Sequence, residues 1–217
     1  MIKIENIDVY GFEAAIRGAR NPMNSWHLMD SCTNNGEFEI GEKDYDLLRR
    51  LTIAGPEHRK WNRMVTVTMD ITAPLYWWKE YDTYKVATVA NSCSTMHKIQ
   101  SKEFTLDDFS HEHLVSLRLL NAARNIFNDF EHYEPKLKKT CDFEITKKDI
   151  WWQMIQLLPT SYNQKRTVHL NYEVLGTMYH QRRHHKLDEW QVFCDTLEML
   201  IPYGEFITKD FGDKNVM

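Results

Sequence analysis

The clearest alternation of apolar and polar positions in the chain lies between residues 62 and 71. Every second side chain in its centre is apolar, namely Val65, Val67, Met69 and Ile71. Because successive side chains of a strand point to opposite faces, the pattern predicts a β-strand with one buried face. A looser alternation over residues 2–10 predicts a second strand, at the edge of a sheet.

Helical spacing of apolar residues predicts two helices in the first part of the chain. One follows the edge strand and ends at Gly18 or at Asn21-Pro22. The other spans residues 42–53 and stops before the Gly-Pro pair at 55–56, as a C-cap glycine followed by proline indicates. Residues 24–36 between them are polar and turn-rich, which predicts a surface loop without regular structure, a candidate binding loop.

Two later helices begin at sequences typical of a capping box. The segment 105–108 (TLDD) resembles such a box, and leucines at three- and four-residue intervals then predict a long amphipathic helix to about Asp129. Thr146 and Asp149 cap another helix, which stops at Pro159. Its apolar residues go around more than one face, so we expect burial on two sides, within the domain or against another subunit.

The last predicted helix spans residues 188–200 and ends at Pro202. Its apolar side chains recur on one face, which we expect to be core: Trp190, Phe193, Leu197 and Leu200. Residues 131–143 form a polar, Lys-rich connection, most simply a solvated loop.

Composition adds limits to this picture. The 217 residues are 42% hydrophobic and 27% charged, which is typical of one globular domain over residues 1–217. The net charge of −4 argues against binding to duplex nucleic acid as the main activity. Four scattered cysteines without a C-x-x-C pair argue against a zinc ribbon or a disulfide framework and favour a reducing cytoplasm. No signal peptide or membrane span is apparent, so we expect a soluble protein with no membrane partner.

The stretch 71–99 combines aromatic, charged and small polar residues more densely than a core or a solvated face requires. After Pro74 it carries five aromatic side chains, namely Tyr76, Trp77, Trp78, Tyr81 and Tyr84. One interpretation is a helix whose aromatics pack inward while Lys79, Glu80 and Asp82 face water. The other is that the stretch carries chemistry, since the ten Tyr, ten Phe and seven Trp of the chain must fill a core, a stacking pocket or a subunit interface.

This stretch resembles the signature region of the flavin-dependent thymidylate synthases (the ThyX family). There a strand ending in Ala-Pro leads into a helix and then into R-H-R-x-x-S-x-N-E-x-S-x-R-Y. In a gapless register, Thr83-Tyr84-Lys85 occupies the R-H-R positions that hold the flavin phosphates in the family, Thr88 the Ser, and Lys79-Glu80 an upstream Arg-Gln pair. One inserted residue after Val89 aligns Asn91 and Ser94 with the motif Asn and second Ser, and leaves Ser92, Met96 and His97 at the Glu, Arg and Tyr.

A second block is similar to the family's L-P … N-x-R-x-x-x-x-x-x-x-x-R region. The Leu-Pro, the Asn and the second Arg match without a gap at Leu158-Pro159, Asn171 and Arg182. Asn171 also has a structural explanation as a helix N-cap. Arg182 and Arg183 open a basic cluster that suits a phosphate, although cations at a helix C-terminus also interact favourably with the macrodipole.

A histidine just before the central strand helps to bind flavin in the family, within a His-Glu-x-x-x-x-x-H element. Here Glu57 and His58 stand in reversed order, and His58 taken alone reads as a surface histidine.

The resemblance implies an α+β fold with a small, mostly antiparallel sheet flanked by long helices, assembled as a homotetramer with shared sites. It implies reductive methylation at C5 of dUMP or a related pyrimidine nucleotide, with FAD as cofactor and methylenetetrahydrofolate as co-substrate. The cofactor residues that it implies are His58, Lys79, Tyr84, Lys85, Thr88 and Asn171. The substrate residues that it implies are Glu80, Asn91, Ser92, Cys93, Ser94, Thr95 and Arg182. No catalytic residue is assigned.

Three other hypotheses stand beside this one. The missing R-H-R and R-Y residues favour a nucleotide- or flavin-binding protein that kept the fold and lost the reaction. Cys93 with His97 is a minor candidate for a nucleophile pair. His180, His184 and His185 have metal-ligand spacing, but the adjacent Arg and Lys residues repel cations, so we expect no metal.

Overall fold

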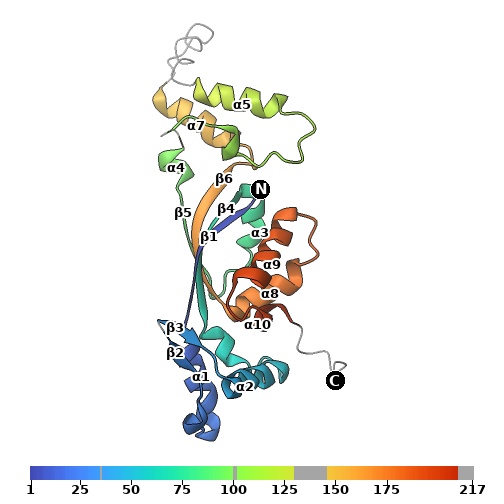
Figure 1. The fold of residues 1–217 in the computed structure, drawn as a ribbon. Helices are drawn as coiled ribbons and strands as arrows, with labels where there is room; N and C mark the ends of the chain where they lie inside the picture. The colour runs from blue at the N-terminus through green and yellow to red at the C-terminus, as the bar shows by residue number, and fades with distance from the viewer. Residues whose placement is uncertain (35, 100–101, 130–145, 210–217) are drawn as a thin grey trace. The chain divides into compact units, whose positions relative to one another are not determined.

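The computed structural model describes residues 1–34, 36–99, 102–129 and 146–209. It is an α+β fold with a small antiparallel sheet and several helices, as the resemblance implies (Figure 1). The strands are β1 (Lys3–Tyr10), β2 (Cys32–Asn34), β3 (Glu37–Glu39), β4 (Thr66–Pro74), β5 (Val89–Ser92) and β6 (Asn163–Asn171). Four of them form a sheet in the order β1-β4-β6-β5, and β2 pairs with β3.

The helices vary from one turn to more than three. The α-helices are α1 (Phe12–Arg20), α2 (Glu42–Ile53), α3 (Leu75–Tyr81), α4 (Thr95–Lys98), α5 (Arg118–Asn128), α7 (Lys147–Leu157), α8 (Tyr172–Arg182), α9 (Asp188–Leu200) and α10 (Glu205–Thr208). The 3₁₀ turns are η1 (Asn21–Met23), η2 (Trp26–Leu28), η3 (Lys60–Arg63) and η4 (Leu106–Asp108). No helix in the described ranges is long and apolar enough to cross a membrane.

The chain divides into two compact units. Unit 1 comprises Met1–Lys3, Thr72–Asp82 and Asn91–Arg166, and unit 2 comprises Ile4–Ile71, Thr83–Ala90 and Thr167–Met217.

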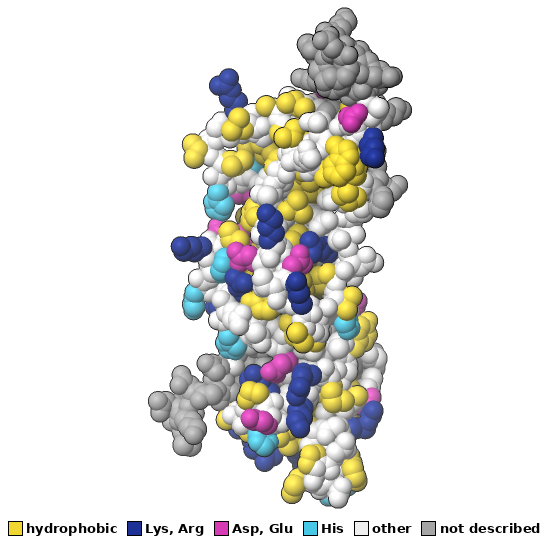
Figure 2. Space-filling view, turned by 180° about the vertical axis from the view of Figure 1, so that it is seen from behind, with side chains coloured by type: hydrophobic (Ala, Val, Ile, Leu, Met, Phe, Trp, Pro, Cys, Tyr) yellow, Lys and Arg dark blue, Asp and Glu magenta, His cyan; other side chains and the backbone are white. Residues whose placement is uncertain are grey.

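Charged side chains of both signs are interspersed on the face of the protein that Figure 2 shows.

Strand β4 confirms the alternation in the sequence. All four apolar side chains of that pattern are fully buried: Val67, Met69 and Ile71 in β4, and Val65 just before it. β1 lies at the edge of the sheet, as predicted. The short helix after it, the helix over residues 42–53 and the helix over residues 188–200 are also confirmed, as α1, α2 and α9.

In unit 1, helix α3 confirms the interpretation of an inward aromatic face. Trp77, Trp78 and Tyr81 are buried, whereas Lys79 and Asp82 are exposed. A separate cluster of buried apolar side chains underlies α5 and α7, consisting of Ile99, Phe104, Phe109, Leu120, Phe127 and Met154.

The predicted start of the long helix after residue 105 is wrong. The capping box of Thr105 and Asp108 is present, but it closes only the single turn η4. Phe109 then pairs with Tyr162 in an antiparallel β-bridge, which requires extended backbone and ends the turn. Helix α5 begins only at Arg118.

Of the two alternatives for α7, burial on two sides within the domain is wrong, and burial against another subunit stays a prediction. Met154 is buried, but Trp152 and Leu157 are 41% and 59% exposed, so only one side of α7 packs against the rest of unit 1. Its capping box of Thr146 and Asp149 is confirmed. The predicted connection over residues 131–143 lies outside the described residues.

In unit 2, the predicted structureless loop over residues 24–36 is wrong, because it holds η2 and β2, and β2 pairs antiparallel with β3. The cause is Asp44, which is fully buried in α2 and accepts the backbone N–H groups of Asp30 and Ser31 at 3.0 and 2.9 Å. Arg20 donates its Nε–H to the same carboxylate at 2.6 Å. This buried ion pair fixes the path of the chain into β2.

Helix α9 supplies the core of unit 2 beside α8. Trp190, Phe193 and Leu197 have no exposed surface, as predicted. Leu200 was expected on the same face but is 61% exposed, because it is the last residue of the helix.

Candidate functional site

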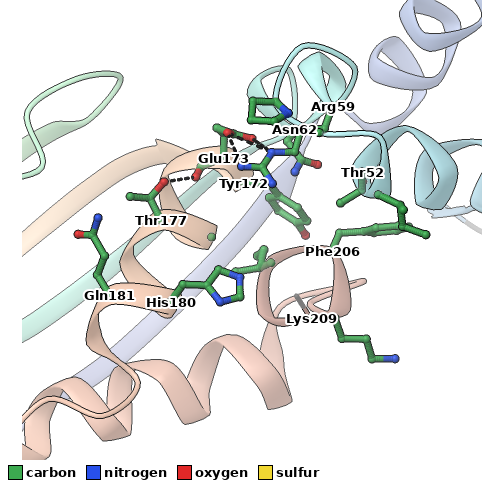
Figure 3. Close-up of a pocket in the computed structure, with 15 residues that line it drawn as sticks. Thr52, Arg59, Asn62, Tyr172, Glu173, Thr177, His180, Gln181, Phe206 and Lys209 are labelled. Carbon is green, nitrogen blue, oxygen red and sulfur yellow. Dashed lines mark hydrogen bonds and ion pairs between the residues drawn. The ribbon is translucent and has the colours of Figure 1, made fainter. Parts of the chain in front are cut away.

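Unit 2 contains a pocket of about 410 Å³, which lies within the usual range for small-molecule sites (Figure 3). One side of helix α8 forms one wall, through Glu173, Thr177, His180 and Gln181, which recur at three- and four-residue spacing. The remaining wall comes from the end of α2, the turn that follows it, η3 and α10. Phe206 and Tyr172 also border the pocket, but both are buried, at 3% and 0% exposed.

Gly55 makes the turn that leads from α2 into the pocket wall. Its φ of 109° is a conformation that glycine adopts without strain, as the predicted C-cap glycine requires. Its carbonyl accepts the backbone N–H groups of His58 and Arg59, each at 3.0 Å. The turn brings the Arg59 side chain to α8.

Arg59 and Glu173 form a bidentate ion pair in the wall of the pocket. The Arg59 Nε lies 3.2 and 3.0 Å from the two carboxylate oxygens, and its Nη2 lies 3.0 Å from Oε1. The side chains are 35% and 25% exposed, so the pair is partly shielded from water. Figure 3 shows it between η3 and α8.

The residue after Trp61 in η3 is a buried amide. Asn62 lines the pocket and is only 3% exposed. Within the described part of the chain, its Oδ1 has no hydrogen-bond partner. Buried polar groups in proteins are usually paired, so this oxygen calls for an explanation.

A chain of hydrogen bonds joins the pocket to the basic end of α8. Gln181, which lines the pocket, accepts a hydrogen bond from the Tyr84 hydroxyl at 2.9 Å. The same hydroxyl accepts the Nε–H of Arg182, also at 2.9 Å. The Arg182 guanidinium lies 5.0 Å from the centre of the Trp190 ring and 5.5 Å from that of Tyr84, within cation–π range of both.

Arg183 does not share this arrangement. It forms ion pairs with Asp195 and Glu198 of α9, and the hydrogen bond to Asp195 raises its pKa. The expected phosphate cluster of Arg182 and Arg183 is therefore divided, since Arg183 bridges two helices.

The structure brings together some of the sequence-predicted cofactor and substrate residues in unit 2. Tyr84 and Arg182 are hydrogen-bonded, and the Thr88 hydroxyl donates to the Tyr84 carbonyl. Lys85 and His58 are exposed, and His58 precedes Arg59 in the turn without lining the pocket itself. Asn171 is buried, and its side chain accepts the Val174 N–H at 3.0 Å, which confirms the N-cap.

The other predicted site residues lie in unit 1. Lys79 is exposed and Glu80 half-buried on α3. Asn91 and Ser92 belong to the exposed strand β5, Cys93 and Ser94 follow it, and Thr95 begins α4. Cys93 is held in place through its backbone, because its N–H donates to the Lys165 carbonyl at 2.9 Å and its carbonyl accepts from the Gln164 side chain at 2.8 Å.

Sequence reasoning missed Arg166 as an ordered cation of unit 1. Its guanidinium carbon lies 4.2 Å from the centre of the Trp78 ring, and its Nη1 lies 2.8 Å from Asp82. It also missed Asn62, Glu173 and Gln181 in unit 2. These residues belong to no local motif, and only the folded chain places them around one pocket.

Comparison with known proteins finds a match to the fold of this chain but none to its sequence. No protein-family model matches the chain, and no curated protein sequence matches it. Solved structures do match. Thymidylate synthase X (ThyX) from Helicobacter pylori, crystallised with FAD and dUMP, aligns with a TM-score of 0.68 over 98% of this chain and 100% of its own, at 12% identity. The chain has a ThyX-like fold.

A second neighbour extends the comparison. The UMP/dUMP methylase PolB from Streptomyces cacaoi, bound with 5-Br dUMP, aligns with a TM-score of 0.57 over 91% of this chain and 88% of its own, at 13% identity. At these sequence identities, the two comparisons show a shared fold alone.

Proposed function

We propose that this chain is a flavin-dependent enzyme that methylates C5 of dUMP or a related pyrimidine nucleotide. The fold, shared over nearly the whole chain with ThyX and with a UMP/dUMP methylase, supports the class of reaction. The observation that carries the proposal is the Gln181–Tyr84–Arg182 hydrogen-bond chain, which joins a pocket of small-molecule size to an oriented guanidinium.

The residues of the pocket suit part of FAD. Its volume is of the size that one ring system with its sugar needs. Lys209 supplies positive charge for a phosphate group at the wall, whereas the charge of Arg59 is balanced by Glu173. By resemblance, His58, Lys79, Tyr84, Lys85, Thr88 and Asn171 belong to the cofactor site. When bound and reduced by a two-electron donor, the flavin would supply the hydride of the reaction.

Arg182 is proposed to bind the phosphate of the nucleotide. Its Nε is bonded to Tyr84 and its plane lies near Trp190, so the side chain loses little further freedom on pairing with an anion. By resemblance, Glu80 and the segment Asn91, Ser92, Cys93, Ser94 and Thr95 are also proposed to bind nucleotide.

The overall reaction balances with methylenetetrahydrofolate as the carbon donor. The C5–H bond of the pyrimidine breaks with loss of a proton, a C–C bond forms to the methylene carbon, and that carbon gains the hydride. Tetrahydrofolate leaves, and a two-electron donor such as a reduced nicotinamide restores the cofactor. The task of the protein is to hold the reactants in the correct geometry.

We also propose, on the resemblance alone, a cytoplasmic homotetramer with sites shared between subunits. Light scattering of the purified protein tests this assembly: a mass near four times 25.9 kDa is expected, and a monomer at micromolar concentration contradicts shared sites.

A binding protein that lost the reaction is the second candidate. It is favoured by Glu173, because the family pattern N-x-R places an arginine there when Asn171 is its Asn. Met96, at the position of the motif Arg, also favours a binding protein.

Absorbance and tritium release test the proposal. Purified protein incubated with FAD should retain the flavin absorbance bands after desalting, and it should release tritium from dUMP labelled at C5. The two candidates differ in folate, since the enzyme needs methylenetetrahydrofolate for release whereas a binding protein retains flavin or nucleotide without it. A colourless protein without tritium release contradicts the enzyme.

A further inference from the structure

Helix α8 contains a glycine in its interior, at Gly176. Glycine is a poor helix former, because it loses more backbone freedom on folding than any other residue. The helix continues on both sides of this position, so neither a cap nor a turn explains the glycine.

Packing does not explain it either. A Cβ atom at position 176 would lie 3.5 Å from the carbonyl oxygen of Ile207 in α10, which is an ordinary van der Waals contact. Apart from the two adjoining residues and the helix backbone, no other atom of the described residues lies within 4 Å of that position. Gly204 differs, because a Cβ there would lie 2.5 Å from the Leu197 carbonyl oxygen. Alanine would therefore fit at position 176 and would favour the helix.

What distinguishes Gly176 is its place in the pocket. It lines the wall that α8 forms, after Glu173 and before His180. Their spacings of three and four residues place all three on one face of the helix. Figure 3 shows Glu173, Thr177 and His180 following one another along α8. The missing side chain leaves a notch in this wall over Gly176, between Glu173 and His180, and a methyl group at position 176 would occupy it.

Several other side chains that border the pocket are closed to a ligand. Asn62, Tyr172 and Phe206 are 3%, 0% and 3% exposed, so neither the amide nor the two rings present a free face. Stacking of a ligand ring on these aromatic side chains is therefore not what the pocket offers. A ligand meets the side chains of α8 instead.

The side chains around the notch are polar and accessible. The Glu173 side chain is 25% exposed, and Thr177 and His180 are exposed. The Thr177 hydroxyl donates to the Glu173 carbonyl at 3.0 Å, so its oxygen can accept a further hydrogen bond. Arg59 balances the charge of Glu173, so this part of the wall has little attraction for a phosphate. Carboxylates accept hydrogen bonds from sugar hydroxyls in dinucleotide sites, and an uncharged group with adjacent hydroxyls matches this wall.

We propose that the notch holds a hydroxylated chain or sugar of the flavin cofactor, which lies against Gly176 and donates hydrogen bonds to the Glu173 carboxylate. This inference rests on the proposed function, because it assumes that a flavin nucleotide enters the pocket. It goes further in assigning one part of the ligand to a named place in the wall. Two parts of FAD carry adjacent hydroxyls, the ribityl chain and the ribose of the adenosine.

Gly176→Ala tests the notch. Because the methyl group competes with the ligand for the same space, the full chain with this substitution should bind FAD roughly tenfold more weakly by calorimetry. Binding of FMN and AMP then identifies the part of FAD. If the ribityl chain fills the notch, FMN weakens and AMP does not; if the ribose fills it, AMP weakens and FMN does not.

Glu173→Gln tests the hydrogen bonds to the hydroxyls. Riboflavin and lumiflavin differ in the ribityl hydroxyls, as adenosine and 2′,3′-dideoxyadenosine differ in those of the ribose, and none of the four carries a phosphate that Arg59 could attract. The variant should weaken binding of the hydroxylated member of the relevant pair about three- to tenfold and leave its counterpart unchanged. Equal changes in both members contradict recognition of hydroxyls by Glu173.

Gly18→Ala is the matched control for the added methyl group. Gly18 lies in α1 of the same unit and is not among the residues that line the pocket. A Cβ there would lie 3.2 Å from the Met64 Sδ, near the end of a flexible side chain that can move aside. This substitution should leave the affinities for FAD, FMN and AMP unchanged.

The melting temperature of the ligand-free protein separates binding from folding. Gly176→Ala should raise it by about 2–4 °C, because alanine favours the helix and no close contact opposes it. A marked decrease assigns Gly176 to the packing of α8 against α10 and overturns the inference. Unchanged FAD affinity in Gly176→Ala, with wild type binding FAD, also overturns it but leaves the proposed function intact. A wild type that binds none of FAD, FMN and AMP contradicts the proposed function itself.

Discussion

Arg182 donates its Nε–H to the phenol oxygen of Tyr84, 98 residues away in the sequence, at 2.9 Å. The contact joins the end of α8 to the segment after α3, the two places where the sequence resembles a nucleotide-binding family. It also orients the guanidinium near the Trp190 ring. A cation held in this way is pre-organised for an anionic ligand.

Arg182→Ala should weaken pyrimidine nucleotide binding by roughly ten- to hundredfold, because a charge-assisted pair contributes about 1.5–3 kcal/mol. Calorimetric titration with dUMP and UMP measures the loss. Arg183→Ala is the control, since Arg183 is paired with Asp195 and should affect thermal stability rather than affinity. Equal affinities in wild type and Arg182→Ala, with a lower melting temperature in the variant, would assign Arg182 to the helix C-terminus.

Tyr84→Phe should weaken nucleotide binding less than Arg182→Ala does. The ring near the guanidinium remains, but the hydroxyl that bonds Gln181 and Arg182 is lost. We expect a loss of about three- to tenfold, from one hydrogen bond worth about 0.5–1.5 kcal/mol. In the double variant with Arg182→Ala, the Tyr84 substitution should have little further effect; fully additive losses show that the two residues act independently.

The sequence predicts those elements whose residues carry a local physical signal. β4 alternates strictly and buries one face, and Asn171 caps α8 with its own side chain. β5 lacks such a signal, because all four of its residues are exposed and its pairing in the sheet is a tertiary effect. The β2–β3 pair was missed for a similar reason, since the buried carboxylate of Asp44 holds the chain there from another element.

In the candidate site, too, some residues carry a signal in the local sequence and others do not. Arg182 was predicted because its position matches a motif, and Tyr84 because it lies in a second motif; the structure joins the two by a hydrogen bond, and their role in binding stays a prediction. Asn62 and Glu173 could not be found, because the burial of one and the ion pair of the other arise only when η3 packs against α8.

The Arg59–Glu173 pair should contribute about 1 kcal/mol of coupling to the free energy of unfolding, since it is bidentate but only partly buried. A double-mutant cycle of Arg59→Met and Glu173→Gln, measured by urea denaturation, isolates that energy. Arg59→Lys should not restore it, because an ammonium cannot make the two-point contact. A coupling indistinguishable from zero contradicts the pair's role in shaping the pocket wall.

Ser31→Ala should lower the free energy of unfolding by about 1.5–3 kcal/mol at neutral pH, because the Ser31 hydroxyl donates to the buried Asp44 carboxylate at 2.6 Å. Burial alone raises the pKa of Asp44, but the hydrogen bonds from Ser31 and Arg20 outweigh it and lower the pKa below 3.8.

The sign of the pH dependence follows from that direction. The stability linked to Asp44 is fully present above its ordinary pKa and is lost as the pH falls through the lowered value. The difference between wild type and Ser31→Ala should thus be constant near neutrality and shrink in acid below 3.8. Ser25→Ala is the control, since that hydroxyl makes only a 3.4 Å contact and should change stability by less than about 0.5 kcal/mol. A difference that persists unchanged in acid rules out the charged carboxylate as its source.

Release of tritium from C5-labelled dUMP and UMP tests the central claim most directly. The full chain, supplied with FAD, methylenetetrahydrofolate and a reduced nicotinamide, should release tritium to water from at least one of the two nucleotides. Release should fall when FAD or folate is omitted and should be reduced in Arg182→Ala. A protein that binds FAD and nucleotide yet releases no tritium from either substrate contradicts the enzymatic claim and favours a binding protein that kept the fold without the reaction.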